Sequence, residues 1–138
     1  MARTVLADTG AIVAALRSRD KHHAWARQQW SGLTEPCLTC EAVVSECFFL
    51  LEGAKEGKEK LSQLLERGVI RVAFDFADSK QETLSLMRRY HDTPMSFADA
   101  CLVRMSEMFA ESQVFTTDSD FVVYRRFGRQ VIPLIVPW

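Results

Sequence analysis

The sequence of 138 residues has no long hydrophobic run and no strong excess of charge of either sign. A membrane-spanning helix needs about 20 apolar residues, and the first apolar stretch is interrupted by Asp8 before it could form a signal-peptide core. We therefore expect a cytoplasmic protein with no membrane partner. The net charge is −1, so a nucleic acid would have to be bound by a local basic patch or through metal ions.

Cysteine is also scarce, and the four cysteines do not suggest a disulfide framework. Cys37 and Cys40 form a C-x-x-C motif, whose spacing is compatible with metal binding or redox chemistry. However, no second pair and no C-x-x-H completes a zinc site. We interpret all four as buried thiols.

The composition is that of an ordinary globular protein, with 48% hydrophobic and 25% charged residues. These values exclude a disordered, collagen-like or coiled-coil chain. The length is that of one domain, covering residues 1–138.

Short apolar segments alternate with segments of helical periodicity along the chain. Strands are predicted at residues 4–7, 37–39, 69–73, 114–117 and 131–136. Helices are predicted at 11–16, 21–30, 40–52, from about 55 to Gly68, at 78–90 and at 96–110, with Thr39 capping the third. This alternation predicts an α/β fold with a mostly parallel sheet flanked by helices on both faces.

Acidic residues stand where such a fold would place a ligand site. Asp8 and Asp118 follow predicted strands, and the carboxyl ends of parallel strands line the binding crevice of an α/β sheet. Glu46 lies in the apolar helical segment AVVSECFFLL, where a partly buried carboxylate needs a basic partner, a hydrogen-bond network or a cation.

Each acid also has a structural explanation. Glu46 could form a salt bridge at a helix edge, and Ser96 and Asp99 have the spacing of a capping box. Asp8 and Asp118 could be ordinary turn residues. Considered together, four carboxylates converging on one sheet edge would repel each other unless they were protonated or bridged by divalent cations. Oxygen ligands of this kind suit Mg²⁺ or Mn²⁺, which can activate water for attack on a phosphodiester.

The segments that carry these acids are VLADTGAIVAAL, CEAVVSECFFLL, YHDTPMSFADACLVRMSE and VFTTDSDFVVYRRFG. In order and spacing they resemble the PIN-domain ribonucleases, in particular the VapC-like toxins of toxin–antitoxin pairs. The resemblance spans nearly the whole chain. It implies a three-layer sandwich with a central, mostly parallel sheet of about five short strands, and a metal-dependent endoribonuclease.

The resemblance also assigns roles to residues. The matched acids are Asp8, Glu46, Asp99 and Asp118, which would be catalytic and hold Mg²⁺ or Mn²⁺, with Asp120 as a supporting metal ligand. Glu41 lies in the same helix as Glu46 but does not match the family pattern. Thr9 and Thr117 match the hydroxyl residues beside the acids, and Ser96 replaces an additional acid of close relatives, so one bound metal ion is expected.

The partners that the resemblance implies are an RNA substrate, an antitoxin protein and a second copy of the chain. Candidate phosphate-binding residues are Arg17, Arg19, Arg88, Arg89, Arg125 and Arg126, although each could equally belong to a solvated helix face. Phe48, Phe49 and Met108 could form dimer contacts, but we expect them in the core.

Other functions remain as alternatives. A phosphatase of the haloacid-dehalogenase type needs an acid at the position of Gly10, and a receiver domain needs adjacent early acids and a late lysine that the chain lacks. No Ser/His/Asp arrangement is found. The main rival is a non-catalytic PIN-like interaction module with a vestigial acidic site, which predicts no binding of metal.

Overall fold

A parallel sheet of five short strands lies at the centre of the structure, a computed structural model that describes residues 3–138. All four pairs of neighbouring strands are parallel. In spatial order the strands are β3 (Ile70–Val72), β2 (Cys37–Thr39), β1 (Thr4–Ala7), β4 (Ser112–Phe115) and β7 (Leu134–Ile135). The predicted parallel α/β sheet is therefore confirmed.

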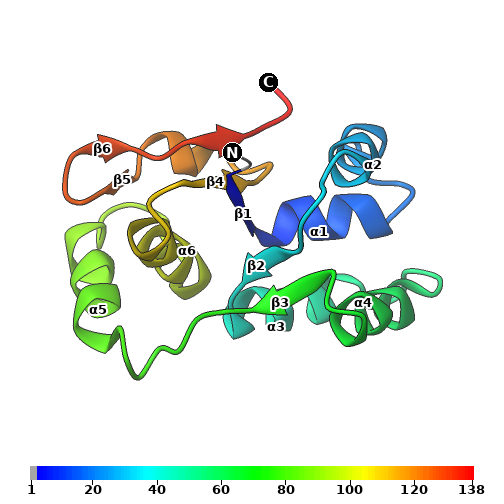
Figure 1. The fold of residues 1–138 in the computed structure, drawn as a ribbon, viewed down its shortest axis with the longest axis horizontal. Helices are drawn as coiled ribbons and strands as arrows, with labels where there is room; N and C mark the ends of the chain where they lie inside the picture. The colour runs from blue at the N-terminus through cyan, green and yellow to red at the C-terminus, as the bar shows by residue number, and fades with distance from the viewer. Residues whose placement is uncertain (1–2) are drawn as a thin grey trace.

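Helices cover both faces of this sheet, with α1 and α2 on one side and α5 and α6 on the other (Figure 1). The helices are α1 (Thr9–Leu16), α2 (His23–Ser31), α3 (Glu41–Leu50), α4 (Gly57–Glu66), α5 (Lys80–Arg89) and α6 (Phe97–Met108). A short 3₁₀ helix, η1 (Ser119–Val122), and a two-stranded antiparallel ribbon of β5 (Arg125–Arg126) and β6 (Gln130–Val131) follow β4. This is the three-layer sandwich expected from the sequence.

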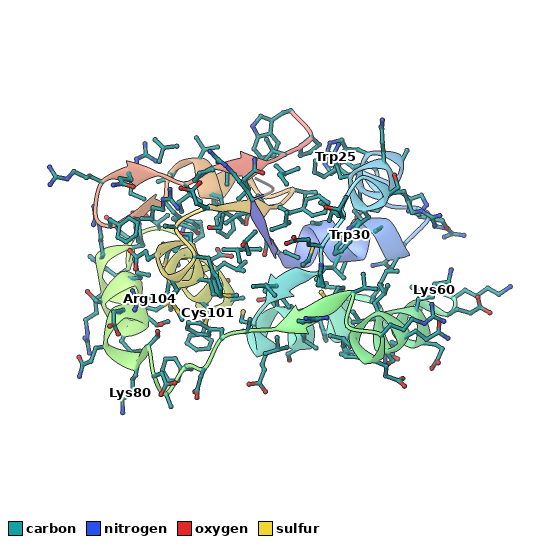
Figure 2. All side chains as sticks on the ribbon, in the orientation of Figure 1. Trp25, Trp30, Lys60, Lys80, Cys101 and Arg104 are labelled. Atoms are coloured by element: carbon teal, nitrogen blue, oxygen red, sulfur yellow. The ribbon has the colours of Figure 1, made fainter. Side chains whose placement is uncertain are left out.

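The central strand β1 shows why the sheet needs helices on both faces. Val5, Leu6 and Ala7 are consecutive and all buried, although successive side chains of a strand point to opposite faces. On β4, the buried Phe115 ring contacts Trp25 and Trp30 of α2, with ring centroids 5.5 and 5.4 Å apart. Figure 2 labels Trp25 beside α2 and Trp30 lower, where α1 passes.

The register of β1 and β4 aligns the carboxyl ends of the two strands. Leu6 pairs with Val114 and Ala7 with Phe115, and the amide of Asp8 continues the ladder by donating to the carbonyl of Phe115 at 2.9 Å. The residues that follow each strand, Asp8 and Thr116, are thus brought to the same edge of the sheet.

Three details of the predicted fold are wrong. The last predicted strand, residues 131–136, is divided at Pro133 into β6 and β7, because proline has no amide for the ladder and a fixed φ. Cys40, not Thr39, is the N-cap of α3, since the Thr39 hydroxyl donates to the carbonyl of Ala7 at 2.8 Å. Phe49 and Met108 are 78% and 46% exposed instead of buried.

Within residues 3–138, no helix is both long and apolar enough to span a membrane. The four cysteines are free and buried, as predicted. Burial raises the pKa of the Cys37 thiol to about 12, which keeps this half of the C-x-x-C motif protonated and unreactive.

Candidate active site

Asp8 occupies the junction between β1 and α1 and is only 5% exposed. It is the N-cap of α1, where its Oδ1 accepts a hydrogen bond from the amide of Thr9 at 2.8 Å. Its Oδ2 accepts from the hydroxyl of Thr116 at 2.6 Å. Both carboxylate oxygens are therefore held in place at the carboxyl end of the central strand.

Burial raises the pKa of Asp8 from 3.8 to about 7. The Thr116 hydroxyl and the Thr9 amide lower this pKa, but the negative charges of Asp99 and Asp118 raise it further. A bound cation would lower the pKa of Asp8, because its positive charge would compensate both the burial and the neighbouring negative charges.

Asp118 lies on the loop after β4, where it caps η1 by accepting from the amide of Asp120 at 2.9 Å. The amide of Asp118 donates to the hydroxyl of Thr116 at 2.9 Å. The Thr116 hydroxyl thus bonds Asp8 and the Asp118 backbone at once, and fixes the ends of β1 and β4 relative to each other. Burial and the Asp118 charge also raise the pKa of Asp120.

Asp99 reaches the same region from the first turn of α6. The predicted capping box is present, with the amide of Asp99 donating to Ser96 Oγ at 3.0 Å and the amide of Ser96 to Asp99 Oδ2 at 3.3 Å. The hydroxyl of Tyr124 also donates to Asp99 Oδ2, at 2.9 Å. Burial and the Asp118 charge raise the pKa of Asp99, which is 6% exposed.

Glu46 projects from α3 toward the start of α1. Its Oε2 accepts a hydrogen bond from the hydroxyl of Thr9 at 2.8 Å, so Thr9 joins Glu46 to the residue next to Asp8. The partial burial of Glu46 predicted from its apolar helix is confirmed, whereas Glu41 is exposed. Glu46 forms no salt bridge within residues 3–138, and the hydroxyl is the partner that its burial required.

Four of the carboxylates, those of Asp8, Asp99, Asp118 and Asp120, interact electrostatically, although they are not arranged as a preformed ligand shell. Asp99 and Asp118 act on Asp8, and Asp118 acts on Asp99 and Asp120. Throughout the described chain, no lysine, arginine or histidine pairs with Asp8, Glu46, Asp99, Asp118 or Asp120. The described residues also include no set of three Asp, Glu, His or Cys side chains close enough to hold one ion as they stand. Metal binding would require the side chains to move closer together.

Sequence reasoning missed two residues of this region, Thr116 and Tyr124. The resemblance indicates Thr117, not Thr116, as the hydroxyl residue beside the acids, and a strand-end threonine gives no sign of which way its hydroxyl points. Tyr124 lies 25 positions after Asp99 and is completely buried. Only the folded chain brings its hydroxyl to that carboxylate.

Gly10 explains how α1 can begin so close to the loop after β4. A Cβ atom at this position would lie 2.1 Å from Thr117 Oγ1. We expect Gly10→Ala to lower the free energy of unfolding by about 1–3 kcal/mol through overpacking, as measured by urea denaturation. Gly32→Ala, where the nearest atom is 3.6 Å away, is the control. Adding Thr117→Ala should restore most of the loss, and an additive double variant would contradict the proposed contact.

The model of one protein family matches residues 5–126, and that family is the PIN domain. The chain belongs to the PIN domain family. No curated protein sequence matches this PIN domain at a significant level.

Among solved structures, this PIN domain is similar to Mycobacterium tuberculosis VapC20, described as a Sarcin-Ricin loop cleaving toxin. The TM-score is 0.78 at 20% sequence identity, over 94% of this chain and 100% of the other. At this identity the similarity shows a shared fold, which agrees with the sheet order and helical layers described above.

Proposed function

We propose that this PIN domain is a metal-dependent endoribonuclease, the toxin of a toxin–antitoxin pair. The observation that carries the proposal is the group of carboxylates at the ends of β1 and β4, coupled to one another and without any basic partner in the described chain. Such a group is stabilised by a divalent cation. The similarity to the VapC20 toxin supports the choice of RNA as substrate.

The donor set consists of carboxylate oxygens, which favour Mg²⁺ or Mn²⁺ over zinc. Asp8, Asp99 and Asp118 would hold the ion, with Glu46 and Asp120 as further candidate ligands. When bound, such an ion would lower the pKa of a coordinated water and stabilise the charge that develops on the leaving oxygen of the phosphodiester.

The other roles in the proposed reaction are carried out by side chains of the protein. Glu46 is held by Thr9 at the side of the site, where it can accept a proton from the attacking water. Thr116 fixes the orientation of Asp8, and Tyr124 that of Asp99. Burial raises the pKa of Tyr124 well above its ordinary value, so this side chain stays protonated and acts as a hydrogen-bond donor.

The PIN-like interaction module remains the alternative, and metal binding separates the two proposals. We expect Mn²⁺ at 100 times its dissociation constant to stabilise the protein by about 2.7 kcal/mol. Differential scanning calorimetry at pH 7.5, with and without Mn²⁺, measures this effect. Asp8→Asn should lose most of the stabilisation, whereas Asp92→Asn, at an exposed position, should retain it.

Absence of any Mn²⁺ effect on the wild-type protein would favour the interaction module. An equal effect on the wild-type protein and on Asp8→Asn would place the ion elsewhere. Calcium provides a further comparison, because its larger size and higher coordination number should fit the same carboxylates less well.

Two partners belong to the proposal as well. An antitoxin would inhibit the nuclease, and a homodimer could use the exposed Phe49 and Leu50 at the end of α3, which are 78% and 42% exposed.

A further inference from the structure

We infer that a basic pocket at the end of α1 binds phosphate groups of the RNA backbone beside the carboxylate site. The inference rests on the proposed function, because it takes RNA to be the substrate. The pocket has a volume of about 580 Å³ and lies between the end of α1, the start of α2 and the turn that joins α3 to α4. Its basic side chains are Arg17, Arg19, His23, Arg27, Lys55 and Lys60.

The charge of the pocket is unbalanced. No aspartate or glutamate lines it, and none of its arginines or lysines forms a salt bridge within residues 3–138. Among the described residues, Arg17 donates to the carbonyl of Leu50 alone, at 2.9 Å. Five like charges around one hollow repel each other, and a bound polyanion would relieve that repulsion. This concentration of positive charge occurs in a protein whose net charge is only −1.

The pocket lies within reach of the carboxylate site along two helices. Helix α1 begins at Thr9 beside Asp8 and ends at Leu16, a length of about 12 Å. Along α3, Leu50 follows Glu46 by four residues, about one helical turn. The contacts Thr9 to Glu46 and Arg17 to Leu50 hold the two helices together at both points. The pocket therefore begins about one length of α1, roughly 12 Å, from the carboxylates.

Figure 2 shows Lys60 extending from α4 on the side of the molecule where α1 ends. Gly53, in the turn before α4, has a φ of +79° and no atom within 4 Å of an added Cβ. The pocket is therefore open to solvent at this turn, as binding of a chain that continues beyond it requires.

Of the four other candidate arginines, Arg89, Arg125 and Arg126 donate to backbone carbonyls, whereas Arg88 is exposed on α5. Arg126 Nη1 donates to the carbonyls of Ser106 and Ala110 at 3.1 and 2.9 Å, which closes the end of α6. Arg125 Nη1 donates to the carbonyl of Val123 at 3.2 Å, and Arg89 donates to that of Gly128. Of the arginines proposed from the sequence to bind phosphate, Arg17 and Arg19 are the ones that line a cavity of uniform charge.

The test measures the binding of a fluorescein-labelled 12-nucleotide single-stranded RNA by fluorescence anisotropy. EDTA is present throughout, so that metal-dependent cleavage does not interfere. We expect Arg19→Ala and Lys60→Ala each to weaken binding by about fivefold and to lower the slope of log K against log[NaCl] by about 0.7. Both side chains are exposed, and thermal unfolding confirms that each variant is folded.

Lys58→Ala is the matched control. Lys58 lies two residues before Lys60 on α4, carries the same charge, does not line the pocket and pairs with Glu52. This variant should bind RNA as the wild-type protein does. If Arg19→Ala and Lys60→Ala also leave both affinity and salt slope unchanged, the inference is wrong.

Two further ligands, inorganic phosphate and an acidic peptide, test whether the pocket prefers RNA to other anions. Inorganic phosphate should bind at least a hundredfold more weakly than RNA, and equal affinity would indicate a site for small phosphate compounds. A polyglutamate peptide should bind the wild-type protein and the pocket variants with equal affinity. If instead the pocket variants lose affinity for the peptide but bind RNA as the wild-type protein does, the pocket is a site for an acidic protein partner. Either of these results overturns the inference.

Failure of the proposed function gives a different pattern. If the wild-type protein neither cleaves RNA with Mn²⁺ nor binds it in EDTA, the ribonuclease assignment fails and the pocket inference fails with it. If the wild-type protein cleaves and binds RNA but the pocket variants match it, only the pocket inference fails.

Discussion

We expect Asp8→Asn to lose Mn²⁺-dependent RNA cleavage by at least about 10³-fold, which corresponds to roughly 4 kcal/mol of transition-state stabilisation. The reason is the position of Asp8, which is buried at the end of the central strand and is the carboxylate on which Asp99 and Asp118 both act. Asparagine preserves the shape and can still accept from the Thr9 amide, but it cannot contribute negative charge to a cation. Cleavage of a labelled RNA under single-turnover conditions measures the loss.

Asp92→Asn and Glu41→Gln are the controls, since both remove an exposed carboxylate. Glu41→Gln is informative because Glu41 lies on the same helix as Glu46. Both controls should cleave at the wild-type rate. Full activity of Asp8→Asn would show that Asp8 takes no part in the mechanism. If Glu41→Gln lost as much activity as Asp8→Asn, the cleavage rate would depend on the overall negative charge of the protein and not on the carboxylate site.

The second large effect concerns stability in the absence of metal. The pKa of Asp8 is about 7 in the folded protein and near 3.8 in the unfolded chain. Between these values the folded state holds a proton that the unfolded state has lost, so the free energy of unfolding falls as pH rises. The pKa difference corresponds to a decrease of up to about 4 kcal/mol between pH 4 and pH 7.5.

Urea denaturation in EDTA at pH 4.5, 6.0 and 7.5 measures this decrease, with the wild-type protein compared with Asp8→Asn. The variant has no carboxylate to ionise at this position, so its stability relative to the wild-type protein should increase with pH. Saturating Mn²⁺ at pH 7.5 should stabilise the wild-type protein much more than Asp8→Asn. A difference between the two proteins that does not change with pH would contradict the raised pKa of Asp8.

Local patterns were sufficient to predict most of the fold. The apolar residues of β1, the helical periodicity around Ile12 and the Ser96 to Asp99 capping box all depend on neighbours close in sequence. The predictions failed where contacts between residues far apart in the sequence determine the structure. Thr39 does not cap α3 because its hydroxyl finds the Ala7 carbonyl on the adjacent strand, and the ribbon of β5 and β6 depends on pairing that no local pattern indicates.

In the candidate site, too, local sequence predicts some features and distant contacts determine the others. The positions of Asp8 and Asp118 at strand ends follow from strand and turn chemistry, and the apolar surroundings of Glu46 indicate its partial burial. The partners of these acids do not follow from sequence, because Thr116 and Tyr124 reach their carboxylates only after β1, β4 and α6 have packed. Assignment of metal-binding roles to Asp8, Glu46, Asp99, Asp118 and Asp120 is still a prediction.

The hydrogen bond between Thr116 and Asp8 joins residues 108 positions apart. It has a consequence during translation, when the chain emerges from the ribosome starting at its amino terminus. A nascent chain that ends before β4 carries Asp8, Glu46 and Asp99, but it lacks Thr116, Asp118 and the strand that pairs with one edge of β1. The carboxylate group at the end of β1 is therefore completed only after β4 and the residues that follow it have emerged.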